Sequence, residues 1–128
     1  MKICDYCTGI QHVGLPTADM EGTLSFYSKI GFKPVFSTIN DGRRVSFLRL
    51  GNLVVEAYES DNCPGKTGAI DHIALDVENI DEVFALVRKE NLQTEDKVVN
   101  YLPFFENGVR FITIIGPNSE RIEFNHMC

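Results

Sequence analysis

The sequence predicts an α+β fold made of two tandem β-α-β-β-β modules, whose strands curl into a cup-shaped, partly closed sheet. An internal repeat is the first reason: residues 10–15, IQHVGL, return at residues 70–75 as IDHIAL. The second reason is that each copy continues with one segment of helical apolar spacing and then short apolar runs. Because a duplicated unit of this size buries its apolar face against its neighbour, both copies belong to one fold.

The first copy begins with a strand and a helix. Segment 8–16 combines β-branched and apolar residues and stops at Pro16, as strands do. Asp19 is a suitable N-cap, apolar side chains then recur at helical spacing over 20–30, and Gly31 provides a helix stop. Strands are expected at 33–38, 44–50 and 53–59, with turns at Asn40-Asp41-Gly42 and Gly51-Asn52.

The second copy repeats this order. A strand is expected at 70–77, and Asn79 with Glu82 resembles a capping box at the start of an amphipathic helix. That helix is expected at 80–91, followed by a strand or loop at 93–100, strands at 109–115 and 120–126, and a turn at 116–119 between them. The polar linker 60–69 separates copies 8–59 and 70–126, so 8–126 is expected as one domain after an N-terminal extension, 1–7.

Composition limits the function classes. Of the 128 residues, 44% are hydrophobic and 23% charged, which is ordinary for a globular protein. The net charge of -6 argues against a nucleic-acid partner, because phosphate binding needs a positive surface. No apolar run approaches the roughly 20 residues of a membrane helix, and the N-terminus lacks a signal-peptide core. We therefore expect a cytoplasmic protein that acts on a small molecule without membrane contact.

Four cysteines have no evident metal or redox role. Cys4 and Cys7 have the spacing of half a zinc site or of a redox motif, but no second C-x-x-C follows. In a cytosolic protein, isolated cysteines are typically free thiols. The sequence therefore favours free thiols for these two residues as well as for Cys63 and Cys128.

The repeat duplicates one histidine and one glutamate. Strand alternation separates them from the apolar side chains that suit packing on the helices. His126 falls on the face opposite Glu123 and is left out. A lone strand histidine is commonly just hydrogen-bonded, and a lone strand glutamate commonly lies at an exposed edge, but four such residues at matching places favour a site. Those four residues are His12, Glu56, His72 and Glu123.

Two imidazoles and two carboxylates make an N2O2 ligand set. That set suits one divalent ion, with Ni²⁺ or Co²⁺ favoured and Zn²⁺, Mn²⁺ or Fe²⁺ as alternatives. Such an ion polarises a carbonyl and stabilises an enediolate, and a carboxylate beside it moves a proton on the neighbouring carbon. The sequence thus indicates a metal-assisted proton transfer.

Four motifs connect the chain with a known family. They are Gln11-His12-Val13, Ser25-Phe26-Tyr27-Ser28-Lys29-Ile30-Gly31-Phe32, Asp71-His72-Ile73-Ala74 and Gly116-Pro117-Asn118-Ser119-Glu120-Arg121-Ile122-Glu123. With them, residues 8–126 resemble the vicinal oxygen chelate superfamily, which includes glyoxalase I, methylmalonyl-CoA epimerase, extradiol dioxygenases and the fosfomycin and bleomycin resistance proteins. The resemblance implies paired βαβββ modules around a metal, usually in a homodimer.

Within that superfamily, the His-Glu-His-Glu set looks like bacterial glyoxalase I. The resemblance implies a lactoylglutathione lyase-like isomerisation of a 2-oxoaldehyde–thiol hemithioacetal, with Glu56 and Glu123 as ligands and as the bases that shuttle the proton. Pro16 stands where glyoxalase I commonly has an arginine for the glutathione carboxylate, so the thiol stays open. Four arginines are candidate substitutes: Arg43, Arg44, Arg49 and Arg110.

Two alternatives remain. One is another enzyme of the superfamily, an epimerase or, with Fe²⁺, a dioxygenase. The other is a protein that binds an aromatic compound without turnover, which the acidic charge and a phenylalanine-rich interior suit. The phenylalanines in question are Phe47, Phe104, Phe105 and Phe111. The four ligand residues weigh against a pure binder, because binding alone does not need them.

Overall fold

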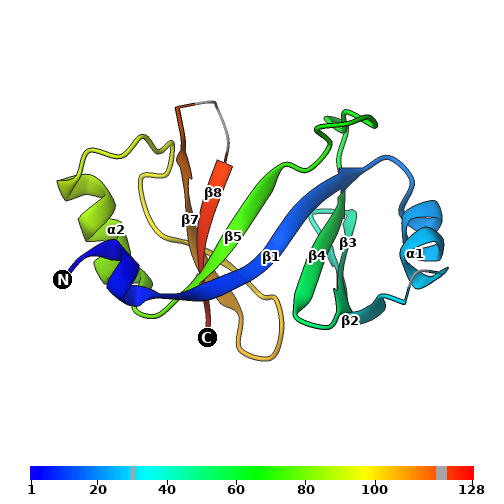
Figure 1. Cartoon of the computed structure of the whole chain (residues 1–128), viewed down its shortest axis with the longest axis horizontal. Helices are drawn as coiled ribbons and strands as arrows, with labels where there is room; N and C mark the ends of the chain where they lie inside the picture. The colour runs from blue at the N-terminus through cyan, green and yellow to red at the C-terminus, as the bar shows by residue number, and fades with distance from the viewer. Residues whose placement is uncertain (30, 118–120) are drawn as a thin grey trace. The chain divides into compact units, whose positions relative to one another are not determined.

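A computed structural model of the chain describes residues 1–29, 31–117 and 121–128. Its elements confirm the α+β class and the repeated β-α-β-β-β order (Figure 1). The first copy contains β1 (Cys7–Thr17), α1 (Met20–Lys29), β2 (Lys33–Asn40), β3 (Arg43–Leu50) and β4 (Leu53–Glu59). The second contains β5 (His72–Val77), α2 (Ile80–Lys89), β6 (Asn100–Leu102), β7 (Val109–Ile115) and β8 (Arg121–Met127), and a 3-10 helix (Ile3–Tyr6) precedes β1.

The chain divides into two compact units. Residues 12–71 form one, called the His12 unit. Residues 1–11 and 72–128 form the other, called the His72 unit. Strand β1 therefore contributes its first half to the His72 unit and its second half to the His12 unit.

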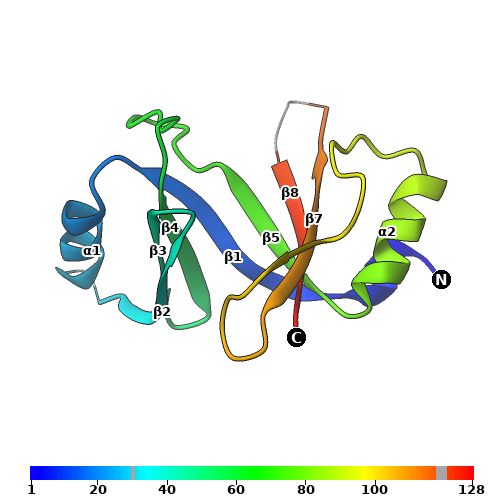
Figure 2. The ribbon, with the colours of Figure 1, turned by 180° about the vertical axis from the view of Figure 1, so that it is seen from behind.

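In the His12 unit the strands are ordered β2-β3-β4-β1, with α1 to one side of β3 and β4 (Figures 1 and 2). Strand β1 runs parallel to β4, whereas β4, β3 and β2 are antiparallel neighbours. The predicted Asn40-Asp41-Gly42 turn is confirmed, since Asp41 and Gly42 both have positive φ, as a tight hairpin requires. The core joins strand and helix side chains: Phe32, Leu48 and Val55, with Leu15, Leu24 and Tyr27 packed against them.

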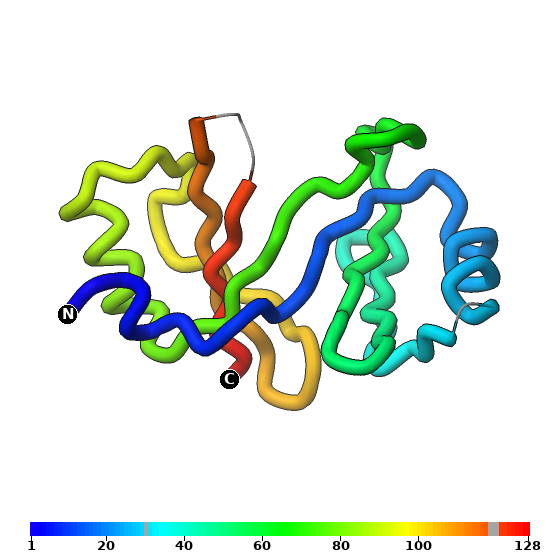
Figure 3. The backbone as a smooth tube through the Cα atoms, in the orientation of Figure 1, coloured from blue at the N-terminus to red at the C-terminus, as the bar shows by residue number. Residues whose placement is uncertain are grey.

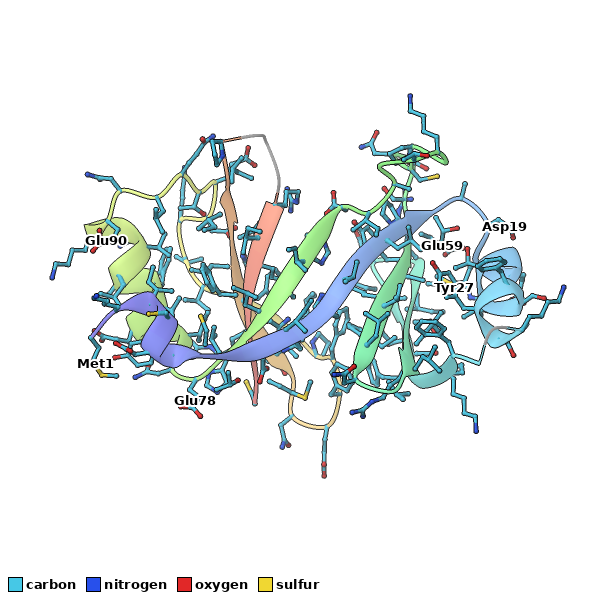
Figure 4. The ribbon with its side chains drawn as sticks, viewed as in Figure 1. Met1, Asp19, Tyr27, Glu59, Glu78 and Glu90 are labelled. Carbon is cyan, nitrogen blue, oxygen red and sulfur yellow. The ribbon has the colours of Figure 1, made fainter. Side chains whose placement is uncertain are left out.

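Helix α1 begins and ends where the sequence indicates. The Asp19 carboxylate accepts a 2.9 Å hydrogen bond from the Gly22 amide and so caps the first turn; Figure 4 labels Asp19 at this end. At the other end Gly31 has φ +108, and the Phe32 amide donates back to the Tyr27 carbonyl. Ile30, the last residue of the predicted helix, lies outside the described residues.

In the His72 unit the strands are ordered β5-β8-β7-β6, and α2 supplies much of the core. The buried members are Val77, Ile80, Val83, Val87, Ile112 and Phe124. Ile3, Tyr6 and Cys7 of the chain start pack against them, so the N-terminal residues stabilise this unit. Asn79 caps α2 by accepting from the Glu82 amide at 3.3 Å, which is the N-cap half of the capping box expected there.

The stretch between α2 and β7 is the least regular part of the fold, and Figure 3 traces it in yellow and orange. Only a bridge between Thr94 and Ile114 and the short strand β6 pair with β7. The strand-or-loop segment predicted at 93–100 is thus mainly loop, with strand structure beginning at Asn100. Of the turn predicted at 116–119, residues 118 and 119 lie outside the described residues, as does residue 120 of the last predicted strand.

The four cysteines are free thiols in the described chain, as predicted. Burial raises the pKa of the Cys7 thiol, and the neighbouring Cys4 raises it further. A raised pKa disfavours the reactive thiolate, which argues against a redox motif here. None of the helices in the described part of the chain has the length and apolar character needed to cross a membrane.

An ion pair ties the start of α2 to β7. The Arg110 guanidinium donates to both carboxylate oxygens of Asp81, at 2.9 and 2.8 Å. These hydrogen bonds lower the pKa of the Asp81 carboxyl, and the charges of Arg110 and His126 act in the same direction against a partial opposing effect of burial. The carboxylate also lies in the first turn of α2, where negative charge is favourable.

We expect Asp81→Asn to lower the urea midpoint at neutral pH and to lose this effect in acid. Because the folded pKa is below the unfolded value of about 3.9, the carboxylate stabilises the fold above that pH, and the stabilisation is lost as pH falls through the folded pKa. Urea unfolding near pH 7, 5 and 3 measures the gap to wild type, which should shrink only at the lowest pH. Glu95→Gln, at an exposed position, is the control; an undiminished gap in acid would contradict this explanation.

Candidate metal centre

One His–Glu pair lies in the His12 unit. His12 is on β1 and Glu56 on the parallel neighbour β4, in a register that sets Gly14 opposite Glu56. The Nε2 atom of His12 lies 3.3 Å from Oε1 of Glu56, and the two side chains are only 2% and 13% exposed. An imidazole and a carboxylate therefore meet in a shielded position, on the strand face predicted from alternation.

Aromatic side chains border this pair. The Phe47 ring packs edge-on against the His12 ring with centroids 5.4 Å apart, and Phe47 lies opposite Glu56 in the β3–β4 register. Phe36 follows, with its ring centroid 6.2 Å from that of Phe47. A register shift in β2 between Pro34 and Phe36 accompanies this placement. These rings keep water from one side of the pair and provide an apolar surface.

A second His–Glu pair lies in the His72 unit. His72 is on β5 and Glu123 on the parallel neighbour β8, in a register that sets Ala74 opposite Glu123. The His72 Nε2 atom lies 3.8 Å from Oε1 of Glu123, and the side chains are 9% and 12% exposed. The other oxygen of Glu123 accepts a 3.0 Å hydrogen bond from Nδ2 of Asn125. Strands β5 and β8 are the equivalents of β1 and β4 in the repeat, and in both pairs the histidine and the glutamate lie on parallel neighbouring strands.

The opposite strand faces carry the core, as predicted. Leu15 and Val55 pack with α1 side chains, and Leu75 and Phe124 pack with those of α2. His126 follows the alternation of Phe124 and lies opposite Arg110 in the β7–β8 register. Its Nδ1 atom is buried with no hydrogen-bond partner among the described residues. His126 therefore belongs to the helix side of the sheet and not to the His72–Glu123 pair.

The arginines considered as carboxylate binders are engaged within their own units. Arg43 pairs with Asp61 at 2.8 Å, and Arg44 pairs with Glu21. Arg49 donates from Nε to the Gly51 carbonyl at 3.0 Å. Arg110 forms the ion pair with Asp81 described above. Each guanidinium already has an acceptor, so the structure gives no specific support for any of them as a thiol-carboxylate receptor.

Residues 9–118 match the family model described as Glyoxalase/Bleomycin resistance protein/Dioxygenase superfamily. The chain belongs to this superfamily. Its βαβββ units and the His–Glu pairs derived above are thus features of a superfamily member. The match extends over most of the chain, including both histidines and Glu56, and ends before Glu123.

Two solved structures and one curated protein illustrate the similarity. The uncharacterized protein YwbC of Bacillus subtilis (strain 168) is 27% identical over 124 residues, covering 90% of this chain and 94% of its own. Methylmalonyl-CoA epimerase from Mycobacterium tuberculosis has a TM-score of 0.80 at 21% identity, covering 96% of this chain and 90% of its own. The Mn(II)-bound glyoxalase from Novosphingobium aromaticivorans has a TM-score of 0.66 at 19% identity, covering 94% and 39%. At these identities, the structural matches establish the fold of this superfamily member.

Three residues beside the two pairs had no functional assignment from sequence. Phe36 is half-buried on β2, and its approach to Phe47 accompanies a register shift that the sequence does not predict. Asn125 and Gln11 are polar residues on strands that already carry a ligand candidate. Strand alternation places Asn125 on the face of Glu123, which is a usable signal, but the hydrogen bond between them is visible only in the structure.

Proposed function

We propose that the two His–Glu pairs together bind one divalent metal ion and that this protein is a lyase or isomerase of glyoxalase I type. The observation that carries the proposal is the shielded imidazole–carboxylate pair that recurs at equivalent strand positions in both units. The proposed ligands are His12, Glu56, His72 and Glu123. The ion itself is expected to be Ni²⁺ or Co²⁺, with Zn²⁺, Mn²⁺ or Fe²⁺ as alternatives.

The residues fit such an ion chemically. Neutral imidazole nitrogens and carboxylate oxygens suit divalent transition ions, and each pair offers one of each in a position with little solvent exposure. When bound, the ion supplies Lewis-acid polarisation of a substrate carbonyl. Membership of a superfamily whose model is named for glyoxalases and dioxygenases supports this reading.

In the proposed reaction the substrate is a hemithioacetal, R–CO–CH(OH)–SR′. Glu123 or Glu56 takes the proton from the carbon that bears sulfur, which gives an enediolate, and the carboxylic acid then returns a proton to the former ketone carbon. The hydroxyl proton passes between the two oxygens, and the product is the 2-hydroxyacyl thioester R–CH(OH)–CO–SR′. Because the change is an isomerisation, no oxidant or other reactant is consumed.

The aromatic side chains beside the His12–Glu56 pair support proton transfer in the proposed isomerisation. Phe47 and Phe36 exclude water beside His12 and Glu56. Exclusion of water strengthens the electrostatic effect of the carboxylate and limits exchange of the abstracted proton, held by the glutamic acid, with solvent. The thiol R′SH is left open, because Arg43, Arg44 and Arg110, three of the four candidate receptors for the glutathione carboxylates, are engaged in ion pairs. The fourth, Arg49, donates to the Gly51 carbonyl.

Metal analysis and a thiol assay test the proposal in sequence. Purified protein is expected to bind about one divalent ion for every two His–Glu pairs, which is one ion per chain. The His12→Ala variant is expected to lose most of this metal. The loaded protein is then assayed with methylglyoxal and glutathione, followed by other small thiols. If the protein binds metal but converts methylglyoxal with none of the thiols, the function is assigned to an epimerase or a dioxygenase instead. Wild-type protein that binds no ion overturns the metal site and favours a binding protein.

A homodimer is part of the proposal, and subunit mixing tests how the pairs combine. If each site joins the His12 pair of one copy to the His72 pair of another, mixed dimers of His12→Ala and His72→Ala subunits contain one intact site. Unfolding and refolding the two variants together should then restore up to about a quarter of the wild-type activity. If both pairs of a site come from one chain, the mixture stays inactive.

A further inference from the structure

The His72 unit contains a hydrogen-bond chain that ends on a proposed metal ligand. Gln11 donates from Nε2 to Oδ1 of Asp76 at 3.0 Å and to Oδ1 of Asn125 at 2.8 Å. Asn125 donates from Nδ2 to Oε2 of Glu123 at 3.0 Å, and Oε1 of Glu123 faces His72 Nε2 at 3.8 Å. We propose that Asn125, oriented by Gln11, is a positioning residue that aims the Glu123 carboxylate at the metal ion; this inference rests on the proposed function.

The two carboxylates determine the direction of the chain. Asp76 and Glu123 are acceptors when ionised, so each must face the NH2 side of its amide neighbour. Asn125 therefore turns Nδ2 toward Glu123, which leaves its Oδ1 facing Gln11, where it accepts the second N–H of that amide. Reversing either amide would set oxygen against oxygen. The amide of Asn125 is thus held in one orientation from both sides.

Anchoring and burial make this orientation rigid. Asp76 is itself held by Thr8, whose hydroxyl donates to Oδ2 at 2.9 Å. Asp76 lies opposite Asn125 in the β5–β8 register, so Gln11 reaches from β1 past β5 to β8. Asn125 is only 4% exposed, so water cannot readily replace its hydrogen bond to Glu123. A carboxylate with one oxygen held in this way presents the other in a defined direction, as partners of metal ligands commonly ensure.

The asparagine that supports Glu123 occurs in the second copy of the repeat and not at the equivalent place in the first. Tyr58 stands two residues after Glu56, at the place equivalent to Asn125, and its side chain has no amide. The duplicated pairs therefore differ in how their glutamates are supported. If the amide served only to stabilise strand pairing, its removal would affect folding and leave the metal affinity unchanged.

Cobalt binding by the full-length chain separates these roles. Asn125→Leu keeps similar volume without the donor, and should weaken Co²⁺ binding about 10- to 100-fold and alter the visible spectrum of the bound ion. Asn100→Leu is the matched control, because Asn100 also donates a 3.0 Å hydrogen bond to a carboxylate, that of Asp96, in the same unit. The control should bind Co²⁺ within about threefold of wild type.

A second variant keeps the test decisive where Asn125→Leu does not fold. Gln11→Met preserves length and leaves Asn125 in place, but it removes the donor to Asn125 Oδ1, so that the Asn125 amide loses one of the two contacts that hold it. Co²⁺ binding should therefore weaken about three- to tenfold. Wild-type protein that binds Co²⁺ while folded Asn125→Leu, or in its absence Gln11→Met, binds equally well overturns the positioning role and leaves the proposed function intact. Wild-type protein that binds no Co²⁺ overturns both.

Discussion

Replacing Glu123 by glutamine is expected to lower turnover at least about 1,000-fold with little change in the fold. The side chain keeps its shape but loses the charge that binds the ion and the oxygen that carries the proton, and general-base removal alone costs about 100- to 10,000-fold. Because the carboxylate is buried beside His72 and Asn125, solvent provides no ready substitute. Steady-state rates with the best thiol identified, together with metal content, measure the effect.

Glu106→Gln is the matched control for this substitution. It makes the same chemical change at an exposed turn of the same unit, so both rate and metal content should stay near wild type. Circular dichroism and urea unfolding establish that both variants are folded. Turnover of Glu123→Gln within tenfold of wild type, at full metal loading, would show that Glu123 is not the base and would transfer that role to Glu56.

Ile112→Ala is expected to destabilise the His72 unit by about 2–5 kcal/mol. Ile112 on β7 has no exposed surface and lies in the cluster that α2 shares with Phe124. Truncation removes the transfer free energy of the lost methylene and methyl groups and leaves a cavity, because neighbours on a strand and a helix relax only in part. Urea unfolding followed by far-UV circular dichroism gives the change in free energy of unfolding.

An exposed isoleucine provides the comparison. Ile39 on β2 is 69% exposed, so Ile39→Ala should change the free energy of unfolding by no more than about 0.5 kcal/mol. Both substitutions remove the same atoms from the same residue type in a strand. Similar losses in the two variants would mean that burial of Ile112 is not what stabilises this core.

Local sequence was a sound guide to the helices and to the faces of the strands. Asp19 caps α1 and Gly31 ends it, because a carboxylate acceptor and a residue free to adopt positive φ act within one turn of the chain. Period-two alternation likewise placed Glu123 away from the helix-packed face. The structure of segment 93–108 could not be predicted in this way, because most of it is loop and its apolar residues show no regular spacing.

The pairing of the strands and its register could not be predicted from local sequence. His12 meets Glu56 because β1 lies parallel to β4, across more than forty intervening residues, with Gly14 opposite Glu56. Many pairings satisfy the same alternation, so apolar patterning alone does not select one. For the same reason, the sequence did not show whether the arginines were available to bind a substrate carboxylate. Arg43 and Arg44 meet their acidic partners only in the folded unit.

The sequence by itself determined the duplicated module, its helix limits and the four ligand candidates, because each depends on neighbours along the chain or on a repeated pattern. Tertiary structure decided the pairing of each histidine with its glutamate and the support of Glu123 by Asn125 and Gln11. Those contacts join residues distant in sequence, and a hydrogen bond forms only when strand register brings donor and acceptor to within about 3 Å.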